Sequence, residues 1–423
     1  MTERKKRILI FAHYYAPDTA STGQILRDLA EGLREEFEVT VICAVPSYDG
    51  KVSPEYRTKR YYLEELNGVR LIRVRVPEFS KADKMSRVRN IITYFFGALG
   101  ASRKAGGQDY IFTISQPPVL GGLLGVIGKW RKHGKMIYCV QDFNPEQVMA
   151  VGYSKNRVLL GIMMAVDKLS CQRSDLVITV GRDLVDTLRR RFPGGHVPRH
   201  AMINNWIDEK ETYPLPADHE RVVEFKERYG LNGKFVIMYS GNMGLYYDLE
   251  NIMGVIERIK PGTKAADGRE VAFAFAGGGS VLDRLTQYAR GHHMDNVVFI
   301  PYQDKEGLIY SLNAADVHWC VSAKGIKGVS CPSKFYGIAA VAKPVLGVLE
   351  EGSEIRRLIE ETGCGLVCEP GDYGQIERNI RWFAEKAGNG RGSEMGRKGY
   401  EYLVRNLTRD MSVKRYAEAI KGL

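Results

Sequence analysis

Residues 7–44 read RILIFAHYYAPDTASTGQILRDLAEGLREEFEVTVICA, and this stretch decides the fold. Residues 7–12 are mostly apolar, which is typical of a short strand that is buried on both faces. A polar loop follows, and apolar side chains then recur at helical spacing over residues 24–36. Residues 38–44 form a second apolar run. Strand, loop, helix and strand in this order are the opening of a Rossmann-like α/β domain.

The alternation of strands and helices continues along the chain and breaks once. Near Tyr213 the stretch YPLPADHE carries two prolines and no apolar periodicity, which indicates a linker. We therefore expect two α/β domains, over residues 1–212 and 213–404. Residues 69–76 alternate apolar and basic side chains, as in an edge strand. The other strands are predicted at residues 109–115, 135–140 and 175–180, and after the linker at 234–241, 271–279, 297–300, 315–321, 344–348 and 365–367.

The charge of the chain points to an anionic partner. Among 423 residues, Lys and Arg outnumber Asp and Glu by 61 to 50, which gives a net charge of +11. Such a surplus is typical of proteins that bind nucleic acid, phosphorylated small molecules or an anionic membrane, although it can serve solubility alone. The sequence contains no phosphate-loop motif, RNA-recognition signature or paired Cys/His finger. We therefore expect no nucleic-acid partner.

The cysteines and apolar runs indicate the compartment. Seven cysteines, mostly within apolar strings, are typical of buried thiols in a reducing compartment. The closest pair, Cys364 and Cys368, has no second pair beside it, so we expect no metal site. The first apolar run is too short for an export signal, and no window holds eighteen uninterrupted apolar residues. These features predict a cytoplasmic protein without a membrane-spanning helix.

Two glycine loops suit a phosphate group. The loops are SGNMG, which contains Gly241 and Asn242, and GGGS, which contains Gly278. Each follows a predicted strand and precedes a helical segment, where backbone N–H groups can face an anion. A single loop of this kind is weak evidence, because turns need glycine anyway. Two loops at successive strand ends favour a ligand in the crevice between two such domains.

A lysine stands against the usual charge preference at a helix start. Small residues from Gly328 to Ser333 precede a helix whose first turn contains Lys334. A cation is unfavourable at the positive end of the helix dipole. Lys334 therefore indicates a nearby anion, or it is simply a solvated lysine.

Three polar residues follow predicted strands in the first domain. Asp142 comes just after the strand at residues 135–140, with Glu146 four positions on, and His13 follows the first strand. Asp142 could act as a base and Glu146 as an anchor for the acceptor, or Asp142 could cap the next helix. His13 could act as a base or hydrogen-bond partner at the same edge.

The motifs together resemble one family. The order and spacing of nine segments are similar to those of family 4 glycosyltransferases with the GT-B fold, especially the branch that builds bacterial surface polysaccharides on lipid carriers. These segments cover nearly the whole chain: IFAHYYAPDTASTG, VQDFNPEQVMAVG, DLVITVG, INNWID, MYSGNMG, FAGGG, VVFIPY, PSKFYGIAAVAKPV and EEGSEIRRLIEETGCGLVCEPGD.

The resemblance implies two Rossmann-like domains that face a central cleft, with the last helix, at 405–423, returning to the N-terminal domain. The C-terminal domain would bind a nucleotide-sugar, and the N-terminal domain would bind the acceptor. Transfer would retain the anomeric configuration and need no metal, because basic and backbone donors would stabilise the departing diphosphate.

The resemblance also implies roles for single residues. Asp142, Lys334 and His13 are the expected catalytic residues, with Asp142 near the acceptor hydroxyl. Gly328, Val329 and Ser330 would approach the sugar through backbone amides. The other expected donor-binding residues are Thr22, Gly23, Gly241, Asn242, Gly278 and Ser333.

The sequence departs from the family pattern at three positions. The family commonly has two glutamates, with seven residues between them, that contact the sugar and the ribose. Aligned on the AKPV segment, these positions hold Val329 and Gly337, and the usual arginine of the first glycine loop is Asn242. The departures leave open the ribose contact and the identity of the sugar, and they allow a weakly active or inactive protein.

Basic and apolar residues are combined in the first domain. Residues 84–104 join basic ends to an apolar centre, and GGLLGVIGKWRKHGK and VLLGIMMAVDK add to this pattern. Such segments suit a helix that lies in a membrane interface, or they pack inside the domain.

These observations lead to one expected function. The chain would transfer a hexosyl or N-acetylhexosaminyl group from a nucleotide diphosphate-sugar, UDP-linked by expectation, to a polyprenyl-diphosphate-linked or glycan acceptor at the inner face of the cell membrane. No cofactor is expected, because the nucleotide-sugar is the substrate. The alternatives are a nucleotide-sugar epimerase on the same fold and a non-catalytic partner of an active transferase.

Overall fold

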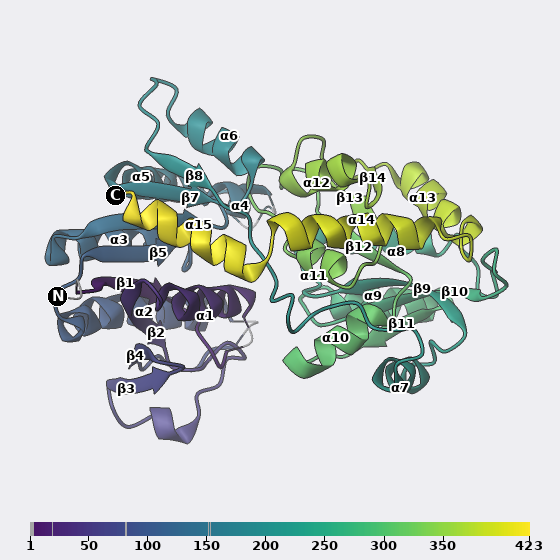
Figure 1. Ribbon diagram of the computed structural model, residues 1–423, viewed down its shortest axis with the longest axis horizontal. Coiled ribbons are helices and arrows are strands. Elements are labelled where there is room, and N and C mark those ends of the chain that lie inside the picture. The colour runs from purple at the N-terminus through teal and green to yellow at the C-terminus, as the bar shows by residue number, and fades with distance from the viewer. Residues whose placement is uncertain (1–3, 19, 81–82, 151, 153) are drawn as a thin grey trace. The chain divides into compact units, whose positions relative to one another are not determined.

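The computed structural model describes residues 4–18, 20–80, 83–150, 152 and 154–423. The chain divides into two units (Figure 1). Unit 1 comprises residues 1–204 and 410–423, and unit 2 comprises residues 205–409. The sequence placed the boundary eight residues later, after residue 212, at the two prolines of the expected linker.

Unit 1 is built on an eight-stranded sheet with the order β3-β4-β2-β1-β5-β6-β7-β8. Neighbouring strands are parallel except for β3 and β4. The strands are β1 (Lys6–Ala12), β2 (Phe37–Ala44), β3 (Tyr61–Leu66), β4 (Val69–Val74), β5 (Tyr110–Ile114), β6 (Lys135–Val140), β7 (Leu176–Thr179) and β8 (His200–Met202). The helices are α1 (Ser21–Leu33), α2 (Lys84–Ala101), α3 (Leu120–Lys132), α4 (Glu146–Ala150), α5 (Arg157–Arg173), α6 (Arg182–Arg191) and α15 (Arg409–Lys421).

Helices cover both faces of this sheet. On β5, Ile111 lies against Gly128 of α3, whereas the next residue, Phe112, contacts the ring of Tyr416 on α15. Because successive side chains of a strand point to opposite faces, α3 and α15 cover opposite faces. Sheets covered in this way require strands that are apolar throughout, which explains the continuous apolar runs of β1, β2 and β5.

The expected edge strand is not at the edge. β4 pairs with the antiparallel strand β3, which the sequence did not predict, and β3 forms the edge. The basic residue Arg73 of β4 is buried and its Nε donates to Glu64 of β3 at 2.6 Å. Of the basic residues in this run, Arg73 is thus buried in an ion pair, whereas Arg70 and Arg75 are exposed to solvent.

Unit 2 contains a six-stranded parallel sheet with the order β11-β10-β9-β12-β13-β14. The strands are β9 (Lys234–Ser240), β10 (Glu270–Ala276), β11 (Val297–Ile300), β12 (Val317–Val321), β13 (Val345–Val348) and β14 (Gly365–Cys368). The helices are α7 (Glu220–Arg228), η3 (Leu245–Tyr247), α8 (Leu249–Ile256), α9 (Leu282–Gly291), α10 (Lys305–Asn313), α11 (Lys334–Ala340), α12 (Glu354–Thr362), α13 (Tyr373–Glu385) and α14 (Arg391–Asn406).

Each unit is therefore a doubly wound Rossmann-like domain, as the sequence predicted for the GT-B fold. The closing helix differs from expectation at its start. Residues 405 and 406 end α14, and α15 begins at Arg409. Among the helices that the structure describes, none is long and apolar enough to cross a membrane.

Candidate functional site

The two glycine loops of unit 2 pack against each other. They follow β9 and β10, which are neighbours in the sheet, so both lie at the edge where the parallel strands end. We call this the carboxyl edge. A Cβ atom on Gly277 would lie 2.2 Å from the carbonyl oxygen of Gly241. Gly277 and Gly241 also have φ angles of 132° and 134°, which favour glycine. Because Gly241 and Gly277 have no side chains, the backbones of the two loops can contact each other.

The N–H groups of the loops are not all available to an anion. Gly241 donates its N–H to Ala276 at 2.8 Å, and Gly277 donates its N–H to Ile300 at 2.9 Å. The N–H groups of Gly241 and Gly277 are therefore engaged within the sheet, whereas a role of Gly241 in contacting a diphosphate stays a prediction. Gly278 differs, because a Cβ there would meet no atom within 4 Å. Gly278 is the point at which a ligand can approach the loop backbone.

Lys334 lies beside the first loop. It is the first residue of α11, and its Cε is 2.9 Å from the place where a Cβ on Gly241 would stand. Its ammonium nitrogen lies 3.7 Å from the ring centroid of Tyr247 and 5.0 Å from that of Tyr239. The hydroxyl of Tyr239 donates to the carbonyl of Asn242 at 2.6 Å. Two tyrosine rings thus hold the lysine next to the glycine loop.

Neither tyrosine was among the expected site residues. Tyr239 is the penultimate residue of β9, and Tyr247 ends the short helix η3 after the loop. Their sequence positions carry no motif, because the contact with Lys334 depends on the path of the loop. Between these two rings, the side chain of Lys334 forms no ion pair among the residues that the structure describes.

The backbone N–H groups of the segment before α11 donate hydrogen bonds within the protein. The amides of Val329 and Ser330 both donate to the carbonyl of Ile326, at 3.0 and 3.2 Å. The carboxylate of Glu350 accepts the N–H groups of Gly325 and Lys327, both at 2.9 Å. The amides that were expected to face the sugar are therefore engaged in a turn. Asn242 and Ser333 are exposed, and Gly328 is buried.

The two positions that hold glutamates in the family lie in apolar surroundings. Val329 is buried, and a Cβ on Gly337 would lie 3.3 Å from the Leu312 side chain and 3.5 Å from that of Ile207. A longer side chain at position 337 would displace these neighbours. The replacement of the glutamates is thus accompanied by apolar packing.

His13 lies at the carboxyl edge of the unit 1 sheet, directly after β1. Its Nε2 is 3.1 Å from the Oδ1 of Asn90, and the Nδ2 of Asn90 donates to the carbonyl of Pro77 at 2.8 Å. Because the amide group is oriented by Pro77, Nε2 must be the protonated nitrogen of His13. Burial lowers the pKa of His13 to about 4. His13 is therefore a neutral hydrogen-bonding group at neutral pH, and a weak base.

Thr22 and Gly23 lie in the first turn of α1, at the same edge. The Thr22 hydroxyl donates to the Oε1 of Gln116 at 2.5 Å. A Cβ on Gly23 would lie 3.3 Å from the backbone of Tyr14, so glycine permits the close approach of α1 to the loop after β1. The structure brings His13, Thr22 and Gly23 to one end of β1.

Asp142 is held at the end of β6. Its N–H and that of Gln141 both donate to the hydroxyl of Ser115, at 3.2 and 3.0 Å. The side chain of Asp142 is half-buried, and α4 begins four residues later at Glu146, so Asp142 is not the residue that caps this helix. Ser115, which fixes the backbone, was not predicted.

Glu146 has a different role from the expected acceptor anchor. Arg191 of α6 binds both carboxylate oxygens of Glu146, and it also binds Asp167 of α5 and the carbonyl of Asn144. The guanidinium of Arg191 lies 4.3 Å from the ring centroid of Phe143. Glu146 is thus part of a buried ion cluster that fixes the loop after Asp142. Arg191 is 45 residues away in sequence, and no pattern links the two.

A polar pocket opens at the carboxyl edge of unit 1. It has a volume of about 650 Å³ and is formed by the loops that follow β1, β2 and β4. Asp18 holds one of these loops, because its Oδ1 accepts the N–H groups of Ser47 and Tyr48 at 3.0 and 2.9 Å. The lining combines carboxylates, hydroxyls and cations: Asp18, Ser47, Tyr48, Asp49, Lys51, Ser53, Arg57 and Glu78.

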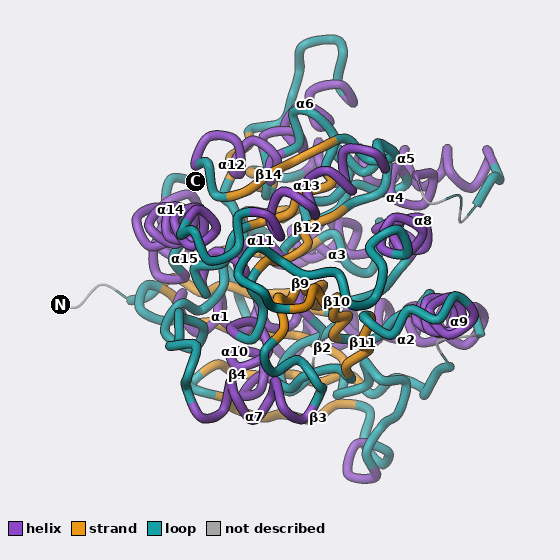
Figure 2. Tube along the Cα trace, turned by 90° about the vertical axis from the view of Figure 1, so that its right-hand side faces the viewer, coloured by secondary structure: helices purple, strands orange, loops and turns teal. Residues whose placement is uncertain are grey.

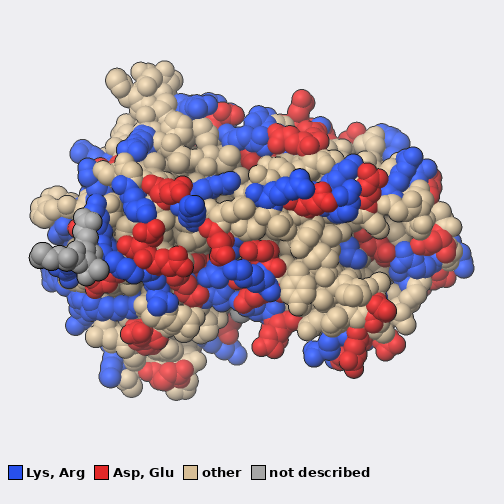
Figure 3. All heavy atoms as spheres, viewed as in Figure 1, with Lys and Arg blue, Asp and Glu red and all other residues tan. Residues whose placement is uncertain are grey.

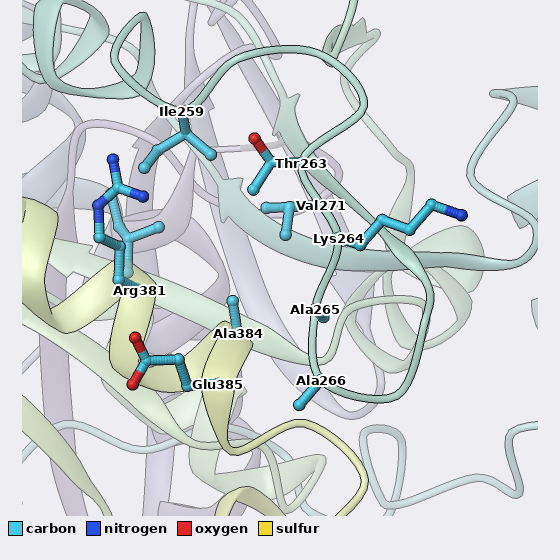
Figure 4. Close-up of a pocket in the computed structure, with 10 residues that line it drawn as sticks. Ile259, Thr263, Lys264, Ala265, Ala266, Val271, Arg381, Ala384 and Glu385 are labelled. Atoms are coloured by element: carbon cyan, nitrogen blue, oxygen red, sulfur yellow. The ribbon is translucent and has the colours of Figure 1, made fainter.

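A second pocket, in unit 2, lies away from the glycine loops. It has a volume of about 310 Å³ and is bordered by Ile259, Thr263, Val271 and the helix α13 (Figure 4). Val271 stands near the start of β10, at the opposite end of the strand from Gly277. Within the described part of the chain, no group of three or more His, Cys, Asp or Glu side chains could hold a metal ion.

Comparison with known proteins identifies relatives over the full chain. Residues 22–206 match the family described as "Glycosyl transferase 4-like domain". "Probable glycosyltransferase WbjE" of Pseudomonas aeruginosa is 25% identical and covers 99% of this chain and 98% of its own. "Putative colanic acid biosynthesis glycosyl transferase WcaI" of Escherichia coli K12 is 24% identical, over 89% of this chain and 91% of its own.

The fold is similar to that of solved structures. HepE of Anabaena in complex with UDP-glucose superposes with a TM-score of 0.71 over 99% of this chain and 100% of that chain. The two sequences are 12% identical, so the likeness concerns the fold alone.

Proposed function

We propose that this chain, whose residues 22–206 match the glycosyl transferase 4-like domain, is a glycosyltransferase that transfers a sugar, with retention, from a UDP-sugar to a lipid-linked or glycan acceptor. In this proposal unit 2 binds the nucleotide-sugar and unit 1 binds the acceptor. The relatives named for colanic acid synthesis and glycosyl transfer support a role in surface polysaccharide synthesis.

One observation carries the proposal. At the carboxyl edge of unit 2, Lys334 lies beside Gly241, and Gly241 in turn contacts Gly277, the residue before Gly278. A lysine that forms no ion pair among the described residues, beside a half-buried glycine loop, suits a diphosphate. Lys334 would neutralise the charge that develops on the leaving diphosphate.

UDP is proposed as the nucleotide because HepE, which has the same fold, was solved with UDP-glucose. Isothermal titration of the full chain with UDP, GDP and ADP tests this choice. Heat of binding with UDP, reduced or absent with the others, supports it. Binding of none of the nucleotides would contradict the transferase and the epimerase readings together.

The acceptor is proposed to bind at the carboxyl edge of unit 1. The polar pocket near Asp18 offers hydroxyls, carboxylates and cations, which is the mixture that binds sugar hydroxyls and phosphates. Asp142 and His13 follow β6 and β1 at the same edge. We assign Asp142 to the acceptor hydroxyl, and neutral His13 to a hydrogen bond.

Retention and metal independence are tested with one reaction. The chain is incubated with a radiolabelled UDP-sugar and a short polyprenyl-diphosphate-linked glycan, with and without EDTA. Full transfer in EDTA and an unchanged anomeric configuration of the product, read by NMR, agree with the proposal. UDP binding without any transfer or hydrolysis would favour the non-catalytic partner instead.

The proposed acceptor also indicates where in the cell the protein acts. A polyprenyl-linked acceptor is embedded in a bilayer, so we propose that the protein associates peripherally with the inner face of the cell membrane.

A further inference from the structure

Three helices that cover one face of the unit 1 sheet carry exposed apolar side chains. α2 contacts α3, and α3 contacts α5, so the three helices form one layer (Figure 2). In the described residues of α1, α6 and α15, which belong to the same unit, Met411 is the only exposed large apolar side chain. The exposed apolar side chains of the layer are Met85, Val88, Ile92, Phe96, Trp130, Val158, Leu159, Ile162 and Leu169.

On α2 these side chains form a single stripe. Met85, Val88, Ile92 and Phe96 follow one another at spacings of three, four and four residues, which keeps them on one side of the helix. Phe96 is 63% exposed and Met85 is 74% exposed. Other residues of α2, including Tyr94, are buried against the sheet. The stripe is therefore not needed to fix the helix to its own domain.

The same layer carries the positive charge of the chain. α2, α3, α5 and the short helix η2 (Ser102–Ala105) contain eleven Lys and Arg residues and one acidic residue. That acid, Asp167, is buried and bound to Arg191. The resulting excess of ten charges compares with +11 for the whole chain.

The charges of three other helices of unit 1 are closer to balance. α1, α6 and α15 contain nine Lys and Arg residues and six Asp and Glu residues. Figure 3 shows the face that includes α15, where basic and acidic side chains are interspersed. Most of the charge surplus noted in the sequence thus lies in the helices of the layer that is also apolar, where Lys129 pairs with an acid outside these helices, Asp175.

We propose that the layer of α2, α3 and α5 is a docking surface for an anionic lipid bilayer. This inference rests on the proposed function and deepens its membrane association by naming the face and the lipid charge. Apolar side chains such as Phe96 and Ile92 enter the boundary between headgroups and acyl chains, and the basic side chains face anionic headgroups. A nucleic acid would use the charge but would gain little from an aliphatic stripe.

Trp130 provides a direct reporter. It lies near the end of α3 and is 74% exposed, whereas Trp206 and Trp319 are buried and Trp382 is half-buried. Transfer of Trp130 into the interface would shift its fluorescence emission to shorter wavelength. The full chain is mixed with phosphatidylcholine vesicles, and separately with vesicles in which phosphatidylglycerol replaces part of that lipid. A shift with the anionic vesicles, absent in Trp130→Phe, is expected.

Paired variants separate the apolar and the charged contributions. In cosedimentation with the anionic vesicles, Ile92→Ser/Phe96→Ser is expected to weaken binding at least about tenfold, because two exposed apolar side chains are lost. Arg87→Glu/Arg89→Glu is expected to weaken it at least about tenfold as well. The matched control is Lys414→Glu/Arg415→Glu on α15, whose exposed side chains make the same charge change in another helix of the unit.

Several results would overturn the proposal. The first is that the chain does not bind anionic vesicles, and the second is that the α15 control loses as much vesicle binding as Arg87→Glu/Arg89→Glu. The third is unchanged vesicle binding by Ile92→Ser/Phe96→Ser, which would indicate a surface for polyanions only. UDP titration of each variant keeps this test separate from the proposed function. Retained UDP binding without vesicle binding contradicts only the docking surface. Vesicle binding without UDP binding contradicts only the proposed donor.

Discussion

The ammonium nitrogen of Lys334 lies 3.7 Å above the ring centroid of Tyr247. The distance is short for a cation–π contact, and a second ring, that of Tyr239, lies 5.0 Å away. The rings restrict the lysine before any ligand is present. They reduce the entropy that Lys334 would lose on binding a diphosphate.

Loss of the Tyr247 ring should therefore weaken nucleotide binding. A cation–π contact of this kind contributes about 0.5–2 kcal/mol. We expect Tyr247→Leu to raise the Kd for UDP roughly three- to tenfold in isothermal titration. Tyr247→Phe keeps the ring and should bind UDP like the original chain. Equal weakening in both variants would show that the hydroxyl matters, and not the ring.

Two glycines in neighbouring loops should respond differently to alanine. Gly241 has a φ of 134°, and a Cβ there would lie 2.9 Å from Lys334, so Gly241→Ala combines backbone strain with a displaced lysine. We expect a loss of about 1–3 kcal/mol in the free energy of unfolding, measured with urea. Gly278→Ala adds a methyl group in open space and should change stability by less than about 0.5 kcal/mol.

The Gly241→Ala and Gly278→Ala variants also test where the diphosphate approaches the loops. If the diphosphate comes to the backbone of Gly278, Gly278→Ala should reduce UDP affinity although the protein remains as stable. An unchanged Kd in this variant would move the ligand away from the second loop.

Arg191 should be essential for the stability of unit 1. It is the partner of two carboxylates, of which Asp167 is buried, so Arg191→Met leaves a buried charge uncompensated. The expected cost is about 3–5 kcal/mol in the free energy of unfolding. Arg189→Met removes an exposed arginine of the same helix and should cost less than about 0.5 kcal/mol. Equal midpoints in urea for the two variants would contradict the buried cluster.

Two buried histidines should make stability depend on pH. Burial lowers the pKa values of His13 and His318 to about 4, from 6.5 in an unfolded chain. Between these values the unfolded chain binds more protons, so stability rises with pH and is lost as pH falls from 6.5 toward 4. Together the two groups contribute a slope of up to about 2.7 kcal/mol per pH unit.

Replacing one histidine isolates its share of this slope. His318 is hydrogen-bonded to the carbonyl of Leu312 at 2.8 Å, and an asparagine amide can donate in its place. His318→Asn should remove about half of the slope that the histidines contribute. Urea unfolding at several pH values measures it, and an unchanged slope would mean that His318 is not held neutral.

The sequence predicted the features that depend on short patterns. The doubly buried strands β9 and β10 are largely apolar runs, and the two glycine loops follow them directly. The features that it missed depend on contacts between distant residues. Arg191 binds Glu146 from another helix, and Tyr247 reaches Lys334 through the path of a loop.

The hydrogen bonds of the loop amides could not be predicted for a related reason. A glycine loop in a sequence suggests free N–H groups, but Gly241 and Gly277 donate theirs to the neighbouring strand ends. Only the three-dimensional pairing of β9, β10 and β11 determines where those hydrogen bonds go.

The most direct test of the account is sugar transfer by Lys334→Ala. The variant and the original chain are compared in the transfer and hydrolysis of a radiolabelled UDP-sugar, with Lys260→Ala, an exposed lysine away from the glycine loops, as the control. We expect a loss of at least about 100-fold in Lys334→Ala, since a group that stabilises the leaving diphosphate is removed, and no change in the control. Unchanged transfer by Lys334→Ala would contradict the placement of the diphosphate in unit 2.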